Sequence, residues 1–148
     1  TPPLGPRPRV FISYAREDGA LASRLFEGLD RSRFEPWLDE DALIGGENWD
    51  QRIRDELAVT DYTLVLYTPA LCRKTDSYVN REIALARNRA LGVRGSFLIP
   101  LRTADIDAEE RVAELSEYQE MPLRPAFFDQ DLSKVVSTML RDFQRRNR

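Results

Sequence analysis

The stretch YTLVLYT at residues 62–68 contains only aromatic, leucine, valine and threonine residues, and Pro69 follows it directly. Such a short uncharged run is typical of a strand that is buried on both faces of a parallel sheet. Four further runs predict strands: RVFISYA (9–15), FEPWLD (34–39), SFLIPL (96–101) and MPLRPAFF (121–128). Pro36 removes one backbone donor from the second run, which predicts that this strand lies near an edge of the sheet.

Amphipathic segments separate the predicted strands. Apolar stripes at helical spacing occupy residues 21–29, 49–57, 79–90 and 132–143. Asp18 is placed to cap the first of these helices, and Asp107 with Glu110 resembles a capping box that opens a short helix. The alternation predicts an α/β domain of the flavodoxin-like, doubly wound kind, with a five-stranded, mainly parallel sheet and helices on both faces.

The two ends of the chain differ in composition from the middle. Residues 1–8, TPPLGPRP, hold four of the nine prolines and are expected to form a flexible lead-in. The domain itself is expected to span residues 9–146 and to be a module of a longer protein.

The composition limits the chemistry that this chain can perform. The 148 residues suffice for one domain, and a net charge of −3 argues against a protein that mainly holds nucleic acid. No apolar run is long enough to cross a bilayer, so no membrane partner is expected. The chain has no His and one Cys, which excludes Ser-His-Asp and Cys-His nucleophiles, a Cys/His zinc site and an internal disulfide. A carboxylate is the leading catalytic candidate, and a cytoplasmic location suits the lack of disulfides.

Ligands of doubly wound folds bind beyond the carboxyl ends of the strands. The loops to search are therefore residues 14–18, 39–46 and 69–76, together with the start of the helix that follows. That helix holds Tyr78 and Glu82 at i and i+4, on one face and displaced by about 100° from the Val79/Ile83 core stripe. This spacing predicts a carboxylate at the seam between core and solvent. An ordinary exposed glutamate between Arg81 and Arg89 fits the same spacing.

Three motifs, in this order and spacing, resemble the Toll/interleukin-1 receptor (TIR) domain family over residues 9–146. RVFISYAREDG (9–19) resembles its first box, and PWLDEDALIGGENWDQRIRDEL (36–57) resembles its second box with the mobile BB loop. SYVNREIALA (77–86) resembles the third-helix motif of the NAD+-cleaving members, in which an aromatic residue precedes a glutamate by four positions. The pair FF (127–128) is similar to the weak third box.

The resemblance implies a TIR NAD+ glycohydrolase or cyclase of bacterial antiphage defence or virulence. Glu82 matches the catalytic glutamate, and the implied substrate-binding positions are Tyr14, Ala15, Arg16, Asp41, Trp49 and Tyr78. The implied self-association surface with other TIR domains is Leu43, Ile44, Gly45 and Gly46. Neither a metal nor a cofactor is implied, since NAD+ is the substrate. A non-catalytic TIR–TIR adaptor, and a related fold that processes free nucleosides, are the alternatives.

Cleavage of the nicotinamide–ribose bond suits a chain without His. The bond breaks through an oxocarbenium-like ribose, and nicotinamide leaves as a neutral base that needs no general acid. A carboxylate is enough to stabilise the positive charge that develops. The product, ADP-ribose or a cyclic isomer, depends on the shape of the pocket.

Overall fold

The computed structural model describes residues 7–38, 49–73, 78–93 and 97–146. Its centre is a five-stranded sheet of order β2-β1-β3-β4-β5, in which every neighbouring pair is parallel. The strands are β1 (Arg9–Ser13), β2 (Glu35–Leu38), β3 (Tyr62–Tyr67), β4 (Leu98–Arg102) and β5 (Met121–Pro122). The predicted flavodoxin-like fold is confirmed, and the strand that contains Pro36 lies at an edge, as expected.

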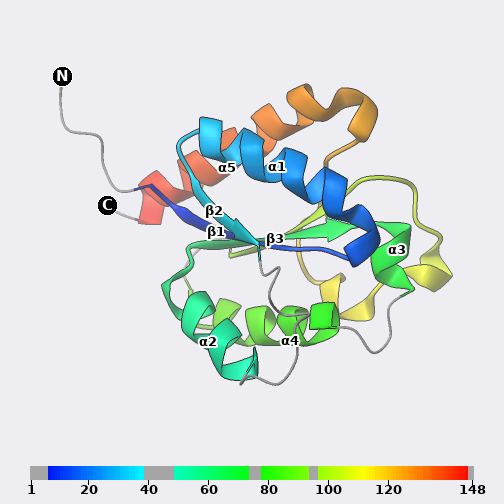
Figure 1. Cartoon of the computed structure of the whole chain (residues 1–148), viewed down its shortest axis with the longest axis horizontal. Coiled ribbons are helices and arrows are strands. Elements are labelled where there is room, and N and C mark those ends of the chain that lie inside the picture. The colour runs from blue at the N-terminus through cyan, green and yellow to red at the C-terminus, as the bar shows by residue number, and fades with distance from the viewer. Residues whose placement is uncertain (1–6, 39–48, 74–77, 94–96, 147–148) are drawn as a thin grey trace.

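Helices cover both faces of the sheet (Figure 1). One face carries α1 (Gly19–Arg31) and α5 (Phe128–Arg146), and the other carries α2 (Trp49–Val59) and α4 (Tyr78–Ala90). The short helix α3 (Pro69–Cys72) follows β3. Single 3-10 turns are labelled η1 (Arg16–Asp18), η3 (Ala108–Glu110), η4 (Ala113–Leu115) and η5 (Pro125–Phe127).

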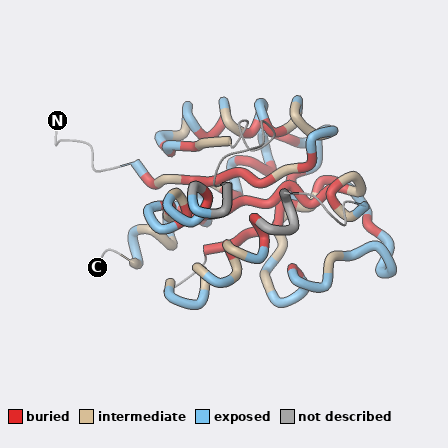
Figure 2. Tube along the Cα trace, turned by 60° about the horizontal axis from the view of Figure 1, so that its bottom comes forward, coloured by how far each residue is buried: buried red, intermediate tan, exposed pale blue. Residues whose placement is uncertain are grey.

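The two middle strands are the most deeply buried part of the chain. All six residues of β3 are buried, and β1 pairs with β3 from Val10↔Tyr62 to Ser13↔Val65. Figure 2 shows these buried strands between helices that are exposed on their outer sides. Alternation along the strands divides the core, because successive side chains point to opposite faces.

Each face of the sheet has its own apolar cluster. Val10 and Ile12 belong to the cluster that includes residues of α1 and α5, whereas Phe11 and Ala15 belong to the cluster that includes residues of α2 and α4. Helix α5 approaches α1 closely at Gly28, where any β-carbon would collide with the Leu132 side chain. These clusters supply most of the apolar burial that stabilises the domain.

Three local predictions are wrong. The Asp18 side chain does not cap α1, because its carboxylate accepts a hydrogen bond from Thr68 instead. A short helical turn, η3, does begin after Asp107 as predicted, but the predicted capping box is wrong, because Asp107 makes no side-chain capping bond. Residues 121–128 are extended only at β5, since their two prolines remove ladder donors, and α5 already begins at Phe128.

The last turns of α5 are attached to the amino end of β3. The Tyr62 hydroxyl donates to Asp142 Oδ2 at 2.6 Å and lies 3.1 Å from the Met139 carbonyl oxygen. The Arg146 guanidinium stacks over the Tyr62 ring at 4.3 Å and donates to the Asp61 carbonyl oxygen at 3.0 Å. Burial and the hydrogen bond to Asp142 raise the pKa of Tyr62, so this phenol stays protonated.

None of the helices described here has the length and apolar character that crossing a bilayer requires.

Two buried threonines, Thr60 and Thr63, predict opposite effects of the same substitution. Thr63 Oγ1 has no hydrogen-bond partner within the described part of the chain. Thr60 Oγ1 donates to the Glu56 carbonyl oxygen at 2.7 Å. We expect Thr63→Val to raise the free energy of unfolding by about 1 kcal/mol, because a methyl group replaces an unsatisfied hydroxyl.

The matched control is Thr60→Val, which we expect to lower the free energy of unfolding by about 1 kcal/mol through loss of that bond. Urea denaturation of both variants measures the two effects. Changes of the same sign in the free energy of unfolding of the two variants would contradict the assignment of Thr63 as the threonine whose hydroxyl is unsatisfied.

Candidate active site

Glu82 lies one turn into α4 and is buried, with 6% of its surface exposed. Its Oε1 accepts a hydrogen bond of 3.0 Å from the hydroxyl of Ser13, the last residue of β1. The expectation of a seam between core and solvent is therefore wrong. Helix α4 packs against β1, and the Glu82 carboxylate is hydrogen-bonded to Ser13 at the end of that strand.

Strand alternation explains why Ser13 meets α4. Phe11 and Ala15 point into the cluster on the α2–α4 face, and Ser13 lies between them on the same side of β1. Ser13 itself is fully buried. It was not selected from the sequence, although a hydroxyl residue between apolar residues of a buried strand is a signal that it needs a polar partner.

The Ser13–Glu82 contact places a carboxylate at the carboxyl ends of the strands, where doubly wound folds bind ligands. Burying a carboxylate costs free energy unless hydrogen bonds compensate, and Ser13 supplies one of them. The low dielectric of such a position strengthens the interaction of the carboxylate with any nearby positive charge. The arrangement is therefore suited to stabilising a cationic group.

The loop after β1 divides between the two faces of the sheet. Ala15 is fully buried on the same face as Glu82, whereas the Tyr14 ring packs against the cluster on the α1–α5 face. Arg16 begins η1 and is exposed. The structure thus brings Ala15 to the Glu82 face and leaves the Tyr14 ring on the opposite face.

The remaining candidate residues are described only in part. Tyr78 begins α4 and Trp49 begins α2, but the structure describes only the backbone of these two residues. The positions that lie outside the described residues are Asp41, Leu43, Ile44, Gly45 and Gly46.

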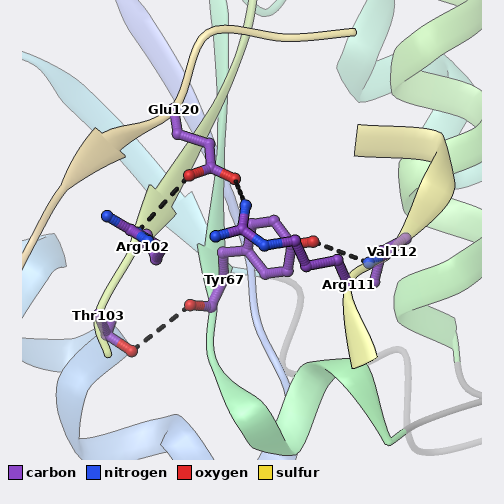
Figure 3. A network of polar contacts seen from close by, with 6 residues as sticks. All are labelled: Tyr67, Arg102, Thr103, Arg111, Val112 and Glu120. Atoms are coloured by element: carbon purple, nitrogen blue, oxygen red, sulfur yellow. Dashed lines mark hydrogen bonds and ion pairs between the residues drawn. The ribbon is translucent and has the colours of Figure 1, made fainter. Parts of the chain in front are cut away.

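A polar network fixes the segment between β4 and β5 to the ends of the strands (Figure 3). The Tyr67 hydroxyl accepts a hydrogen bond of 2.7 Å from the Val112 N–H, and burial raises the pKa of Tyr67. Glu120 lies between two guanidinium groups, 2.9 Å from Arg111 and 3.6 Å from Arg102. These contacts hold residues 111–120 beside the carboxyl ends of β3 and β4.

This segment borders an open cleft of about 680 Å³. Ile83 and Ala84, the two residues after Glu82, line the cleft together with Cys72 and residues 109–114. Burial and the nearby Glu110 raise the pKa of the Cys72 thiol, which keeps it in the unreactive protonated form at neutral pH. Within the described residues, no group of three His, Cys, Asp or Glu side chains is arranged to hold a metal ion.

Comparison with known families and structures gives a consistent result. A family model described as "TIR domain" matches residues 10–136. A prokaryotic SEFIR domain matches with a TM-score of 0.67 and 17% identity, covering 89% of this chain and 98% of that chain.

Two animal proteins match as well. A TIR-STING receptor from C. gigas, solved in complex with 2′,3′-cGAMP, matches with a TM-score of 0.67 and 15% identity, over 88% of this chain but 38% of that chain. The TIR domain of the Toll-related receptor TRR-2 from Hydra magnipapillata matches with a TM-score of 0.62 and 16% identity, over 86% and 97% of the two chains. At these identities the structural matches establish the fold alone.

The Ser13–Glu82 contact predicts an energetic coupling between the two side chains. We expect Ser13→Ala to lower the free energy of unfolding by about 1.5–3 kcal/mol, the usual contribution of a hydrogen bond to a charged group. In a Glu82→Met background, which has no carboxylate, the same substitution should have a much smaller effect. Chemical denaturation of the four proteins of this cycle gives the coupling energy. Equal effects of Ser13→Ala in both backgrounds would show that the hydrogen bond contributes no stability.

Proposed function

The chain belongs to the TIR domain family, and we propose that it cleaves the nicotinamide–ribose bond of NAD+ with Glu82 as the catalytic residue. The family includes NAD+-cleaving members, but membership alone does not assign this activity. The proposal therefore rests on the residues of the candidate active site. The observation that carries it is the buried Glu82 carboxylate, hydrogen-bonded to Ser13 at the carboxyl end of β1.

The proposed reaction needs no proton donor. The bond between the ribose C1′ and the nicotinamide nitrogen breaks, its electron pair stays on the nitrogen, and nicotinamide leaves as a neutral molecule. The ribose becomes oxocarbenium-like, and the negative charge of Glu82 stabilises it. Water then adds to C1′ and releases a proton, which gives ADP-ribose. Attack by the adenine of the same molecule would instead give a cyclic isomer.

Burial and orientation both suit Glu82 to this role. A preorganised charge in a site that excludes water stabilises a transition state more than the same charge in solvent. The Ser13 hydroxyl holds Oε1 and thereby limits rotation of the carboxylate. Its donor, Ser13, is itself fully buried at the end of a central strand, so the carboxylate is oriented by a rigid element.

The substrate-binding part of the proposal centres on the loop after β1. We assign the exposed Arg16 to the pyrophosphate, because a guanidinium binds phosphate oxygens bidentately. Ala15 keeps the position that the family resemblance implies, and its side chain is fully buried in this chain. Asp41, Trp49 and Tyr78 keep the roles that the family resemblance implies, whereas the Tyr14 ring is directed to the other face.

Glu82→Gln is the direct test of the catalytic assignment. The amide keeps the shape of the side chain and accepts the Ser13 hydrogen bond, but it lacks the charge. We expect nicotinamide release from NAD+ to fall by about a hundredfold or more, with little change in the melting temperature. Chromatographic measurement of nicotinamide, together with a thermal melt, reports both quantities.

The matched control is Asp131→Asn, which neutralises a buried carboxylate that Arg124 holds on the α1–α5 side of the sheet. That pair lowers the pKa of Asp131 to about 2. Its stabilising effect is therefore complete above the ordinary aspartate pKa and is lost as the pH falls through 2. Asp131→Asn should lower stability at pH 7 and leave turnover intact. Wild-type turnover in folded Glu82→Gln would refute the catalytic assignment of Glu82, and absence of nicotinamide release from the wild-type chain would favour the non-catalytic adaptor.

Self-association is expected to activate the enzyme through Leu43 and Ile44, apolar residues in the acidic stretch EDALIGGEN (40–48). Nicotinamide release per molecule should rise with protein concentration, and Leu43→Asp with Ile44→Asp should abolish this rise. Leu91→Asp, at a residue that is 86% exposed on the described surface, is the control that should retain it. Constant specific activity in a monomer confirmed by sedimentation would contradict this expectation.

A further inference from the structure

The turn that follows β1 is attached to the end of β3 by a side-chain contact. Thr68 Oγ1 donates a hydrogen bond of 2.5 Å to Asp18 Oδ2. Asp18 occupies the position just before α1, yet its side chain makes no capping bond there. The Asp18 backbone N–H donates to the Ala15 carbonyl oxygen at 2.8 Å, which closes the turn η1. Asp18 thus connects η1 with β3.

Thr68 is a rigid anchor for this contact. It is buried, and its Oγ1 also accepts a hydrogen bond of 3.1 Å from the Leu71 N–H at the start of α3. Leu71 is buried in the cluster on the α2–α4 face. Because Thr68 Oγ1 already accepts from Leu71, its hydrogen is directed to Asp18, and the Asp18 carboxylate is held in one place.

The contact has a direct consequence for Arg16, two residues before Asp18. Arg16 is exposed and forms no ion pair with any described residue. Arg16 and Asp18 lie at the two ends of η1. The Thr68–Asp18 hydrogen bond fixes the end of this turn, and Arg16 begins the same turn with its guanidinium unpaired among the described residues.

We propose that Asp18 is a positioning residue, which through Thr68 holds η1 so that Arg16 presents its guanidinium to the pyrophosphate of NAD+. The inference rests on the proposed function and names a residue that acts on substrate binding without touching the substrate. The proposal predicts that loss of Asp18 weakens the binding of NAD+ equally in the ground state and in the transition state. A small displacement of a binding group is enough to weaken such a contact strongly.

The test is a kinetic cycle of Asp18→Ala and Arg16→Ala in the full 148-residue chain. Asp18→Ala should raise KM for NAD+ about tenfold with kcat within twofold, the pattern of lost uniform binding. In the Arg16→Ala background, Asp18→Ala should raise KM no further. Thr68→Val should reproduce the rise in KM, and Thr68→Ser, which retains the hydroxyl, should restore the wild-type value. Asp129→Ala, which removes an exposed carboxylate from the first turn of α5, is the control that should leave KM unchanged.

Several outcomes would overturn the inference. These are an unchanged KM in Asp18→Ala, additive effects of Asp18→Ala and Arg16→Ala, or a loss of kcat that follows a loss of melting temperature. Calorimetric titration of NAD+ into Glu82→Gln, with and without Asp18→Ala, measures the same tenfold effect without turnover. Wild-type protein that binds NAD+ in this Asp18-dependent way but releases no nicotinamide would refute the proposed reaction and leave the positioning role in place.

Discussion

The parallel pairing of β1 with β3 is the constraint on which the rest of the structure depends. It aligns Ser13 with Val65, so both strands end at the same edge of the sheet, with Thr68 following closely. Because parallel strands require a crossover, α1, β2 and α2 intervene in the sequence between these two neighbours. Residues separated by 69 positions, Ser13 and Glu82, and by 50 positions, Asp18 and Thr68, meet there as a result.

The two faces of the sheet have different roles. On the α1–α5 side, the middle strands contribute the apolar Val10, Ile12, Leu64 and Leu66, and helix α5 packs against them over its length. On the α2–α4 side, the same strands contribute Ser13 and Thr63 between apolar neighbours. Buried polar groups restrict how a core can pack, and one of them, Ser13, bonds the candidate catalytic carboxylate. At these strand positions the α1–α5 face is lined by apolar side chains, whereas the α2–α4 face has two buried hydroxyl groups within its apolar cluster.

The sequence was sufficient for the periodic features and insufficient for contacts between elements. Continuous apolar runs predicted the strands, and Pro36 correctly predicted an edge, because both signals are local. Helical spacing gave the angle of Glu82 relative to its own core stripe, but only the packing of α4 on β1 shows that its carboxylate is buried. Asp18 had the local pattern of a cap, and a tertiary partner, Thr68, changed its role. Ser13 was missed for the same reason.

The end of α5 has a consequence for how this chain is divided into fragments. The family match stops at residue 136, while the acceptors of the Tyr62 hydroxyl, Met139 and Asp142, come later in the helix. A fragment cut at the limit of family similarity would leave a buried phenol without partners and uncover the amino end of a central strand. The hydrogen bonds to Tyr62 therefore make the last turns of α5 part of the fold, although they lie beyond the range that the family model matches.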